Sequence, residues 1–207
     1  MSVDSTRRRN IAVAVTGASG AIYAARTIAA FLAEGCELDV VVSEFGRRLL
    51  REELGDGAAI ERLHDFLAER YGEEVRRGVL TLHSNRDQGA KIASGSQRCE
   101  GMVIVPCSMK TLAGVAHGLS RSLTERAADV MLKERRRLVI VPRETPMSLM
   151  QLRNMVSCAE AGAMILPAMP AFYHMPTTID HLADFVAGKI LAAFGVEHAL
   201  YPRWKDN

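Results

Sequence analysis

Short apolar runs alternate with longer amphipathic stretches along this chain, a pattern typical of a parallel sheet covered by helices on both faces. The apolar runs predict strands at 11–15, 38–42, 79–83, 102–105, 138–141 and 164–166, with Pro106 ending the fourth of them. The amphipathic stretches predict helices at 21–33, 43–53, 60–71, 148–161 and 177–194, and two more that begin at Ser108 and Ser122. This alternation predicts one doubly wound α/β domain.

The 207 residues contain no internal repeat and no low-complexity linker, so we expect a single folded domain. We expect that domain to span residues 11–195 and to follow a flexible N-terminus at 1–10. Residues 196–207 have no packing signal of their own, although they contain Tyr201 and the only tryptophan, Trp204. We therefore expect this tail to lie on another surface or on another subunit.

Composition and charge exclude several classes of protein. Hydrophobic residues make up 48% of the chain and charged residues 24%, which is enough apolar material for a core and excludes intrinsic disorder. The 26 lysines and arginines against 24 acidic residues leave a net charge of +2, too small to favour nucleic acid or a membrane surface as the partner. No apolar run approaches the roughly 18 residues of a membrane span.

The cysteines and histidines lack the spacing of a metal or redox site. Cys36, Cys99, Cys107 and Cys158 form no C-x-x-C pair, and the histidines form no H-x-x-x-H pair, so we expect no metal. The basic start at Arg7–Arg9 precedes an apolar run shorter than the roughly 7–15 residues that a signal peptide needs. We expect reduced thiols and a cytoplasmic protein.

The residues that follow each apolar run are the candidates for chemistry, because ligands of doubly wound sheets bind at the carboxyl ends of the strands. Gly17 and Gly20, in the turn Thr16–Gly20, let the backbone approach an anion at the start of the next helix. A phosphate is the expected ligand there, and a tight turn without a ligand is an equally good interpretation. The motif G-x-G-x-x-G is incomplete.

Three further strand ends carry polar groups. Residues 106–111 place hydroxyl groups at a helix start, which predicts a second set of donors for one large ligand. Arg143 and Glu144 form either a surface ion pair or an anion contact with a proton carrier. The loop 168–174, with Tyr173, either walls an apolar substrate or anchors a crossover. Cys107 is more typical of a small buried side chain than of a nucleophile.

Seven motifs, taken together and in this order, resemble those of the flavin prenyltransferases of the UbiX/Pad type. They are Thr16–Gly20, Ser94–Ser96, Pro106–Thr111, Glu125–Val130, Leu132–Arg136, Val141–Pro146 and Pro170–His174. The resemblance covers nearly the whole chain, from about residue 11 to residue 204. It implies a Rossmann-like (flavodoxin-like) three-layer α/β/α fold with a mostly parallel central sheet.

The resemblance also implies a reaction. Enzymes of this family bind reduced FMN and dimethylallyl monophosphate, and they join the prenyl group to N5 and C6 of the flavin without a metal. The product, prenylated FMN, is the cofactor of UbiD-type decarboxylases. Family members assemble as homododecamers with sites at subunit junctions, and closing such a site would give the tail at 196–207 a role.

The family motifs imply roles for individual residues of this chain. The implied flavin-binding residues are Gly17, Ala18, Ser19, Ser43, Ser108, Met109, Lys110, Thr111 and Arg143. The residues implied for the prenyl phosphate are Tyr173, Lys189, Lys133, Arg126, Ser94 and Trp204, the last as a cover. The implied catalytic residues are Ser19, Glu53 and Glu144, which serve proton movements, and Lys133.

The chain departs from the family pattern at two positions. Lys189 stands where some members have arginine, which keeps the charge but loses the bidentate fork. Gln88 stands where some members have tryptophan, which predicts a less aromatic prenyl pocket. One alternative is an FMN-dependent peptidyl-cysteine decarboxylase, for which His64 and His83 are the candidate catalytic histidines. Another is a non-catalytic flavin carrier or accessory subunit of a decarboxylase.

Overall fold

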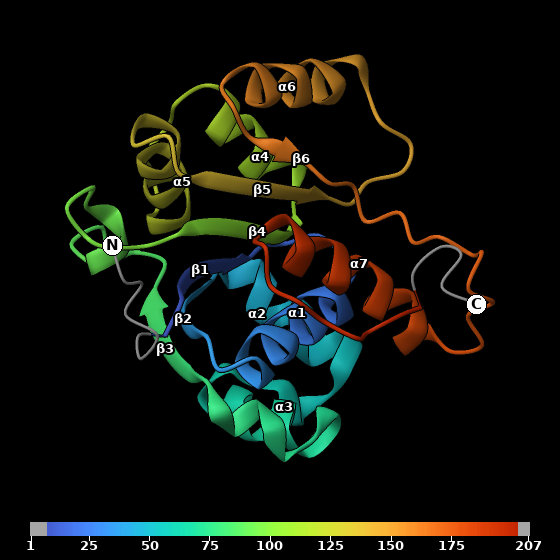
Figure 1. The fold of residues 1–207 in the computed structure, drawn as a ribbon. Helices are drawn as coiled ribbons and strands as arrows, with labels where there is room; N and C mark the ends of the chain where they lie inside the picture. Colours follow the sequence, from blue (N-terminus) through green and yellow to red (C-terminus); the bar gives the residue numbers. More distant parts are fainter. Residues whose placement is uncertain (1–7, 203–207) are drawn as a thin grey trace, which may run out of the picture.

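The computed structural model describes residues 8–202, in which strands and helices alternate as the sequence pattern predicts (Figure 1). The strands are β1 Asn10–Val15, β2 Glu37–Val42, β3 Val79–Ser84, β4 Gly101–Cys107, β5 Arg137–Pro142 and β6 Met164–Ile165. The α-helices are α1 Ala21–Ala33, α2 Glu44–Leu54, α3 Leu63–Tyr71, α4 Met109–Ala116, α5 Leu123–Lys133, α6 Leu149–Glu160 and α7 Ile179–Ala193. Short 3-10 helices lie at η1 Asp56–Ala58, η2 Ile60–Arg62, η3 Glu73–Arg77 and η4 Lys91–Ala93.

The six strands form one parallel sheet in the order β3-β2-β1-β4-β5-β6. This is the strand order of a Rossmann domain, in which the chain winds outward in both directions from the centre. The order reverses between β1 and β4, so the carboxyl ends of these two strands flank the crevice where such sheets bind ligands.

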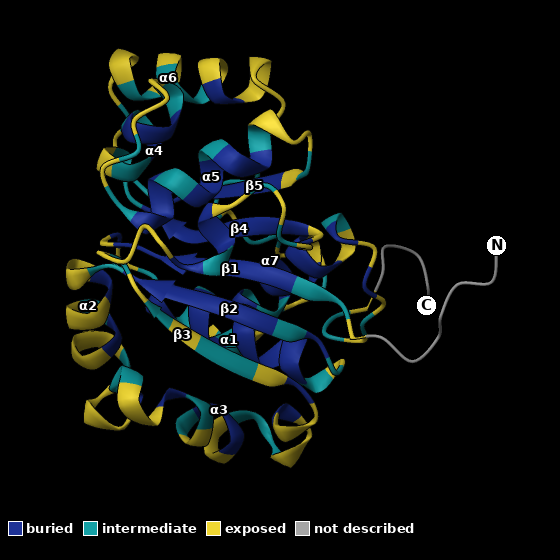
Figure 2. Ribbon diagram, turned by 90° about the vertical axis from the view of Figure 1, so that its left-hand side faces the viewer, coloured by how far each residue is buried: buried dark blue, intermediate teal, exposed yellow. Residues whose placement is uncertain are grey.

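Helices cover both faces of the sheet, with α1, α2, α3 and α7 on one face and α4, α5 and α6 on the other (Figures 1 and 2). Ile11, Val13 and Val15 of β1 pack toward the first layer, whereas Ala12 and Ala14 pack toward the second. Because both faces are buried, the central strands are apolar throughout instead of alternating. The predicted single-domain, three-layer α/β/α fold is confirmed, and its sheet is wholly parallel.

One buried carboxylate interrupts the apolar strands. Asp39 of β2 is fully buried and accepts hydrogen bonds from His83 Nε2 at 2.7 Å and Asn10 Nδ2 at 2.9 Å. Lys91 Nζ of η4 lies 2.9 Å from the same side chain. These three donors satisfy the charge and tie β1, β3 and η4 to β2.

Three predicted boundaries were wrong. Pro106 does not end the fourth strand, because β4 continues to Cys107 with a register shift between Ile104 and Cys107. A proline is tolerated at such an irregularity, where its missing N–H breaks no regular ladder bond. The helix predicted at 60–71 begins as the 3-10 turn η2 and becomes α-helical only at Leu63. The last strand stops at Ile165.

Candidate active site

The turn after β1 is tied to the end of β4. The buried hydroxyl of Thr16 donates to Pro106 O at 2.8 Å and accepts from Ser108 N at 2.8 Å. An ideal Cβ at Gly17 would lie 2.5 Å from Phe45 Cβ, so the turn also packs closely on the start of α2. These contacts fix the first turn beside the starts of α2 and α4.

The N–H groups at the start of α1 are bound by a carboxylate of the chain itself. Glu53 Oε2, from the last turn of α2, accepts from Gly20 N at 2.9 Å and from Ala21 N at 2.7 Å. Gly20 has a φ of 110°, a conformation that favours glycine. A negative side chain satisfies these N–H groups and the helix dipole. In this structure Glu53 binds the N–H groups at the start of α1, and phosphate binding at the turn 16–20 stays a prediction.

A cavity of about 340 Å³ lies at the carboxyl ends of the central strands, and we call it the flavin cavity after the predicted flavin-binding residues in its lining. Its volume falls within the roughly 300–1,000 Å³ of small-molecule sites. The lining includes five predicted flavin-binding residues: Gly17, Ser43, Ser108, Lys110 and Thr111. These residues come from three different strand-to-helix turns, and the fold brings them together. Their place directly after predicted strands was therefore enough to predict them from the sequence.

Three helices begin at the flavin cavity, and each has a serine as its N-cap. Ser43, Ser108 and Ser122 cap α2, α4 and α5, and each hydroxyl accepts from the N–H three residues later at 3.1–3.3 Å. All three serines line the cavity. The positive dipole ends of these helices favour a negatively charged group there.

The other predicted flavin residues lie around the turn after β1. Ala18 is buried, and Ser19 accepts a hydrogen bond from Arg143 Nε at its backbone oxygen, 2.9 Å away. Arg143 follows β5 and so links that strand end to the first turn. Glu144 Oε1 accepts from Thr145 N at 3.0 Å, and no ion pair between Arg143 and Glu144 occurs in residues 8–202. Met109, the first residue of α4, is half-buried.

A second cavity, of about 520 Å³, brings together the predicted prenyl-phosphate residues Tyr173 and Lys189. We call it the α7 cavity, since Lys189 projects from that helix. The ring of Phe185 lies 5.5 Å from Lys189 Nζ and 6.0 Å from the Tyr173 ring. The arrangement combines a cation and a hydroxyl with aromatic surface.

The described part of the tail packs on α7 of its own chain and forms one wall of the α7 cavity. An ideal Cβ at Gly188 would lie 2.6 Å from His198 Cε1 and would also overlap the ring of Tyr201. Glycine is therefore required at 188 for this close approach. Trp204 lies outside the described residues.

Ser94, Arg126 and Lys133 are not brought to the α7 cavity. Ser94 directly follows η4, and Arg126 and Lys133 lie in α5. Both η4 and α5 cover the opposite face of the sheet from α7. Lys133 is paired with Glu134 just before the amino end of β5. Arg126 Nε donates to Ala93 O at 3.3 Å. A six-residue strand spans roughly 20 Å, so Ser94 and Lys133 lie about that far from the carboxyl ends of the strands.

The cysteine and the two histidines considered for other chemistry are buried or in contact with the rest of the fold. Cys107 is fully buried, and this burial raises the pKa of its thiol, which opposes thiolate formation and a role as nucleophile. His83 Nε2 donates to Asp39, and Nε2 of His64, on α3, lies 3.4 Å from Val75 O of η3. Neither histidine lines the flavin cavity, so the geometry does not favour the peptidyl-cysteine decarboxylase alternative.

Several residues that line the two cavities were not expected from the sequence. Among them, Asn85, Arg121 and Glu125 line the flavin cavity, and Glu197 and His198 line the α7 cavity. Asn85 directly follows β3, so the strand-end rule applied to β3 could have found it. Arg121 and Glu125 belong to a helix start that only the tertiary fold brings to the sheet edge.

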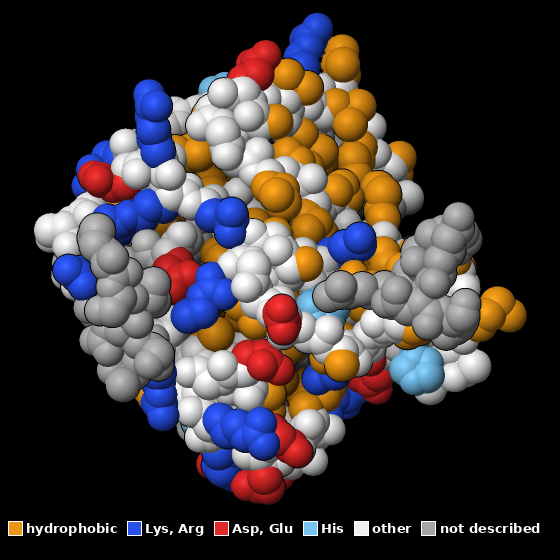
Figure 3. All heavy atoms as spheres, in the orientation of Figure 1, with side chains coloured by type: hydrophobic (Ala, Val, Ile, Leu, Met, Phe, Trp, Pro, Cys, Tyr) orange, Lys and Arg blue, Asp and Glu red, His pale blue; other side chains and the backbone are white. Residues whose placement is uncertain are grey.

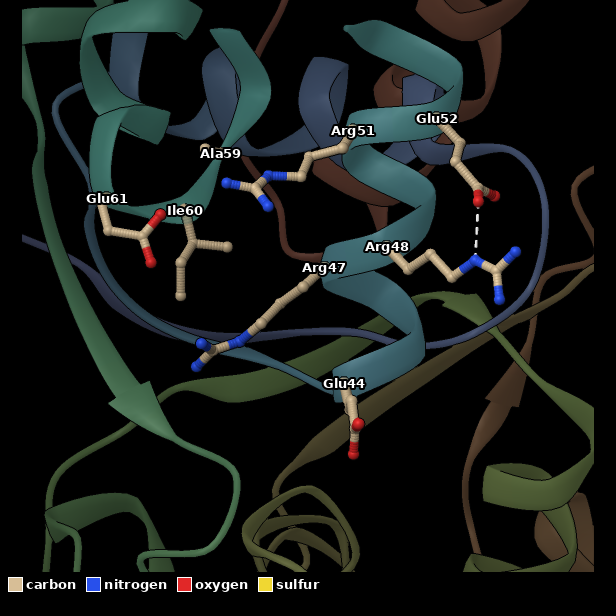
Figure 4. A pocket seen from close by; sticks show the side chains of 8 residues that line it. All are labelled: Glu44, Arg47, Arg48, Arg51, Glu52, Ala59, Ile60 and Glu61. Atoms are coloured by element: carbon tan, nitrogen blue, oxygen red, sulfur yellow. Dashed lines mark hydrogen bonds and ion pairs between the residues drawn. The ribbon is translucent and has the colours of Figure 1, made fainter. Parts of the chain in front are cut away.

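An open groove of about 460 Å³ lies on the outer side of α2 and holds no predicted site residue (Figure 4). Three arginines and three glutamates line it, so its charges balance, and Arg48 pairs with Glu52 at 2.6 Å. Within residues 8–202, no group of three His, Cys, Asp or Glu side chains is arranged to hold a metal ion. None of the helices described is long and apolar enough to cross a membrane.

Comparison with known proteins identifies relatives over nearly the whole chain. The family model "Flavoprotein" matches residues 2–191. The flavin prenyltransferase UbiX of Alkalihalophilus pseudofirmus is 46% identical over 94% of this chain and 95% of its own length.

Two solved structures share the fold at substantial identity. AnUbiX (PadA1), crystallised with FMN and dimethylallyl pyrophosphate, is 39% identical with a TM-score of 0.86, over 96% of this chain and 98% of that chain. A dodecameric FMN-dependent UbiX-like decarboxylase from Escherichia coli O157:H7 is 36% identical with a TM-score of 0.81, over 95% and 99%. The chain therefore belongs to the flavoprotein family and, within it, to the flavin prenyltransferases of the UbiX type.

Proposed function

We propose that this protein is a flavin prenyltransferase. It takes the dimethylallyl group from dimethylallyl monophosphate, joins it to N5 and C6 of reduced FMN, and releases inorganic phosphate. The bond between the allylic carbon and the phosphate oxygen breaks, and bonds to N5 and C6 form. The protons displaced from N5 and C6 are balanced by one taken up on the prenyl carbon skeleton and one on the phosphate.

The observation that carries this proposal is the presence of two cavities with different chemistry in one chain. The flavin cavity offers hydroxyls, helix N-termini and Lys110, whereas the α7 cavity offers Tyr173 and Lys189 beside aromatic surface. A flavin carrier needs only the first of these. AnUbiX, which was crystallised with both FMN and a dimethylallyl phosphate ester, supports the same two-ligand interpretation.

The residues around the flavin cavity fit FMN. Ser43, Ser108 and Thr111 present hydroxyls. Phe45 lies where a side chain at Gly17 would be, so residue 17 contributes only its backbone to the cavity. Bound FMN supplies the nucleophilic N5 and C6 atoms of the reaction. We propose that these residues, together with Ala18, Ser19, Met109, Lys110 and Arg143, hold and orient it.

Tyr173 and Lys189 act on the leaving phosphate. A hydroxyl donor and an ammonium group stabilise the charge that develops on phosphate as the C–O bond breaks. Tyr201 and Val196, which line the same cavity, provide apolar surface that excludes water from the allylic carbon. Trp204 is the proposed cover of this site.

Glu144, Ser19 and Glu53 are the proposed proton carriers. Only one hydrogen bond, from Thr145 N, occupies the Glu144 carboxylate within the described chain, so it has acceptor capacity left for a proton. Glu53 already accepts from Gly20 and Ala21, which fixes its carboxylate beside the first turn. A proton carried by Glu53 is therefore delivered close to Ser19.

The remaining donor-site residues act across a subunit junction in this proposal. Ser94, Arg126 and Lys133 lie on the face opposite α7, so they complete a prenyl-phosphate site only in a neighbouring copy. We propose a homododecamer, by analogy with the dodecameric Escherichia coli relative.

The outer face of α6 supports self-association. Leu149, Met150, Leu152 and Val156 on this helix are each more than 40% exposed, and only Cys158 of its residues is fully buried. Figure 3 shows hydrophobic side chains gathered on this side of the molecule. Apolar patches of this kind mark interaction surfaces.

We also propose a cytoplasmic location and a UbiD-type decarboxylase as the consumer of the product. The four cysteines of the chain are all free and buried, as expected in a reducing compartment. A modified flavin has no further use in a protein that only makes it, so the product must pass to an enzyme that binds it as cofactor.

The test is an anaerobic incubation of the protein with reduced FMN and dimethylallyl monophosphate, followed by denaturation and mass analysis of the flavin. A gain of one C5 unit on the flavin is the expected result. A parallel incubation with dimethylallyl pyrophosphate establishes which phosphate ester is the donor. Tightly bound but unmodified FMN with both donors would contradict the transferase and favour the carrier.

A further inference from the structure

An ion pair between Arg121 and Glu125 forms part of the wall of the flavin cavity. Arg121 precedes α5, and Glu125 lies in the first turn of that helix. Glu125 Oε1 lies 3.3 Å from Arg121 Nη2, and Glu125 Oε2 accepts from Arg121 N at 2.8 Å. The Glu125 side chain is 7% exposed and the Arg121 side chain 60% exposed, so the carboxylate is enclosed and the guanidinium is open to a ligand.

The position of Glu125 is fixed by its neighbours. A Cβ at Gly114 of α4 would lie 2.8 Å from Glu125 Cδ, so the carboxylate packs directly on the backbone of that helix. Ser122 caps α5, but Glu125 accepts from the N–H of Arg121 and not from that of Ser122, in contrast to the capping box that its spacing suggests. The carboxylate therefore holds both the backbone and the side chain of Arg121.

We propose that Arg121, oriented by Glu125, binds the phosphate group of FMN at the mouth of the flavin cavity. The identity of the ligand rests on the proposed function. A phosphate monoester carries close to two negative charges at neutral pH. Among the described residues that line the cavity, Lys110 and Arg121 are the two cations. Glu125 is the carboxylate in that lining, and it accepts a hydrogen bond from Arg121. Charge complementarity therefore places the phosphate between the two cations.

The start of α1 offers no comparable position, because Glu53 already occupies the N–H groups of Gly20 and Ala21. The capped starts of α2, α4 and α5 line the flavin cavity instead, and their dipoles add to the field of the two cations. In this arrangement the phosphate lies toward α5, which leaves the turn 17–19 and Arg143 for the ring system.

Riboflavin, which lacks the phosphate, makes the proposal testable by binding alone. Flavin titrations of the intact assembled protein give the dissociation constants of FMN and riboflavin for each variant. Arg121→Ala is expected to raise the dissociation constant of FMN about tenfold, or about 1.4 kcal/mol. It should change the dissociation constant of riboflavin less than twofold. Arg121→Lys should recover part of the loss, since it keeps the charge without the planar fork.

Glu125→Gln separates positioning from simple repulsion. If Glu125 positions Arg121, Glu125→Gln should weaken FMN binding about threefold in the protein that keeps Arg121. The same substitution should not weaken FMN binding in the Arg121→Ala background. A carboxylate that only repels the phosphate would make Glu125→Gln bind FMN more tightly. Tighter binding would overturn the positioning role of Glu125.

Arg48→Ala is the matched control, because Arg48 forms an ion pair of the same i, i+4 spacing with Glu52 outside the flavin cavity (Figure 4). It removes the same charge and should leave both flavins within twofold of the wild type. Equal weakening of FMN and riboflavin by Arg121→Ala, or no weakening, would overturn the phosphate assignment alone. A wild-type protein that binds no FMN would overturn the proposed function as well.

Discussion

Gly188→Ala tests whether the tail shapes the α7 cavity. The added methyl group would lie 2.6 Å from His198 Cε1 and would overlap the Tyr201 ring, so the segment 196–202 must move away from α7. Four residues of this segment line the cavity and move with it, namely Val196, Glu197, His198 and Tyr201. The substitution therefore alters the cavity around Lys189 without touching Lys189 itself.

The expected change in stability is small because two effects oppose each other. Alanine is favoured over glycine in a helix interior by about 0.5–1 kcal/mol. Losing the packing of the half-buried Tyr201 costs about 1 kcal/mol, or roughly half the value of burying a large apolar side chain. The two nearly cancel, so the midpoint of thermal unfolding should shift by no more than about 2–4 °C.

Catalysis should respond much more than stability. We expect the KM for dimethylallyl monophosphate to rise at least about fivefold, while the dissociation constant of FMN stays within about twofold, because the flavin cavity shares no lining residue with the α7 cavity. Tyr201→Ala should give a similar rise, and the double variant should add little, since both changes release the same contact. An unchanged KM in Gly188→Ala would refute the role of the tail.

Four further predictions concern single residues. Tyr173→Phe should raise the KM for the prenyl donor about tenfold by removing a hydrogen bond to a charged group, and equal loss of donor and FMN affinity would count against the assignment. Glu144→Gln should retain FMN and slow prenyl transfer about a hundredfold in single-turnover experiments, whereas unchanged turnover would remove it from the mechanism. Cys107 should resist thiol reagents at pH 8 until the protein unfolds, because burial raises its pKa. Burial alone would raise the pKa of Asp39, but its three hydrogen-bond donors lower it below the usual 3.8, so the free energy of unfolding should fall as pH drops through that lowered value. Denaturant titrations should show this acid dependence in the wild type and its loss in Asp39→Asn.

The elements of the fold were predictable because burial imposes local patterns. Strands buried on both faces must be apolar throughout, and helices that cover them must be amphipathic, so 11–15 and 21–33 can be recognised in isolation. Serine at an N-cap is likewise a local signal, and Ser108 and Ser122 cap the helices as predicted. The end of β4 was predicted wrongly at Pro106. A proline fits inside this strand only because the pairing of β4 with β5 shifts register there, and the local sequence does not encode that shift.

The candidate site was predictable only in part. The carboxyl ends of parallel strands meet at one edge, so the strand pattern of the sequence is enough to group Gly17, Ser43 and Ser108. The partner of the α1 start could not be predicted, because Glu53 is more than 30 residues away from Gly20 and belongs to another helix. The same holds for Arg121 and Glu125, whose position depends on how α5 packs on α4 at Gly114.

The sequence by itself determined the fold class, the turns that carry the candidate flavin-binding residues, and the family, since these depend on periodicity and on motifs a few residues long. Only the tertiary structure decided which groups share a cavity and which charges are already satisfied. It placed Tyr173 and Lys189 together, put Lys133 across the sheet from them, and gave the α1 start to Glu53. The physical reason is that such contacts join residues far apart in the chain, whose distances are set by packing and not by local sequence.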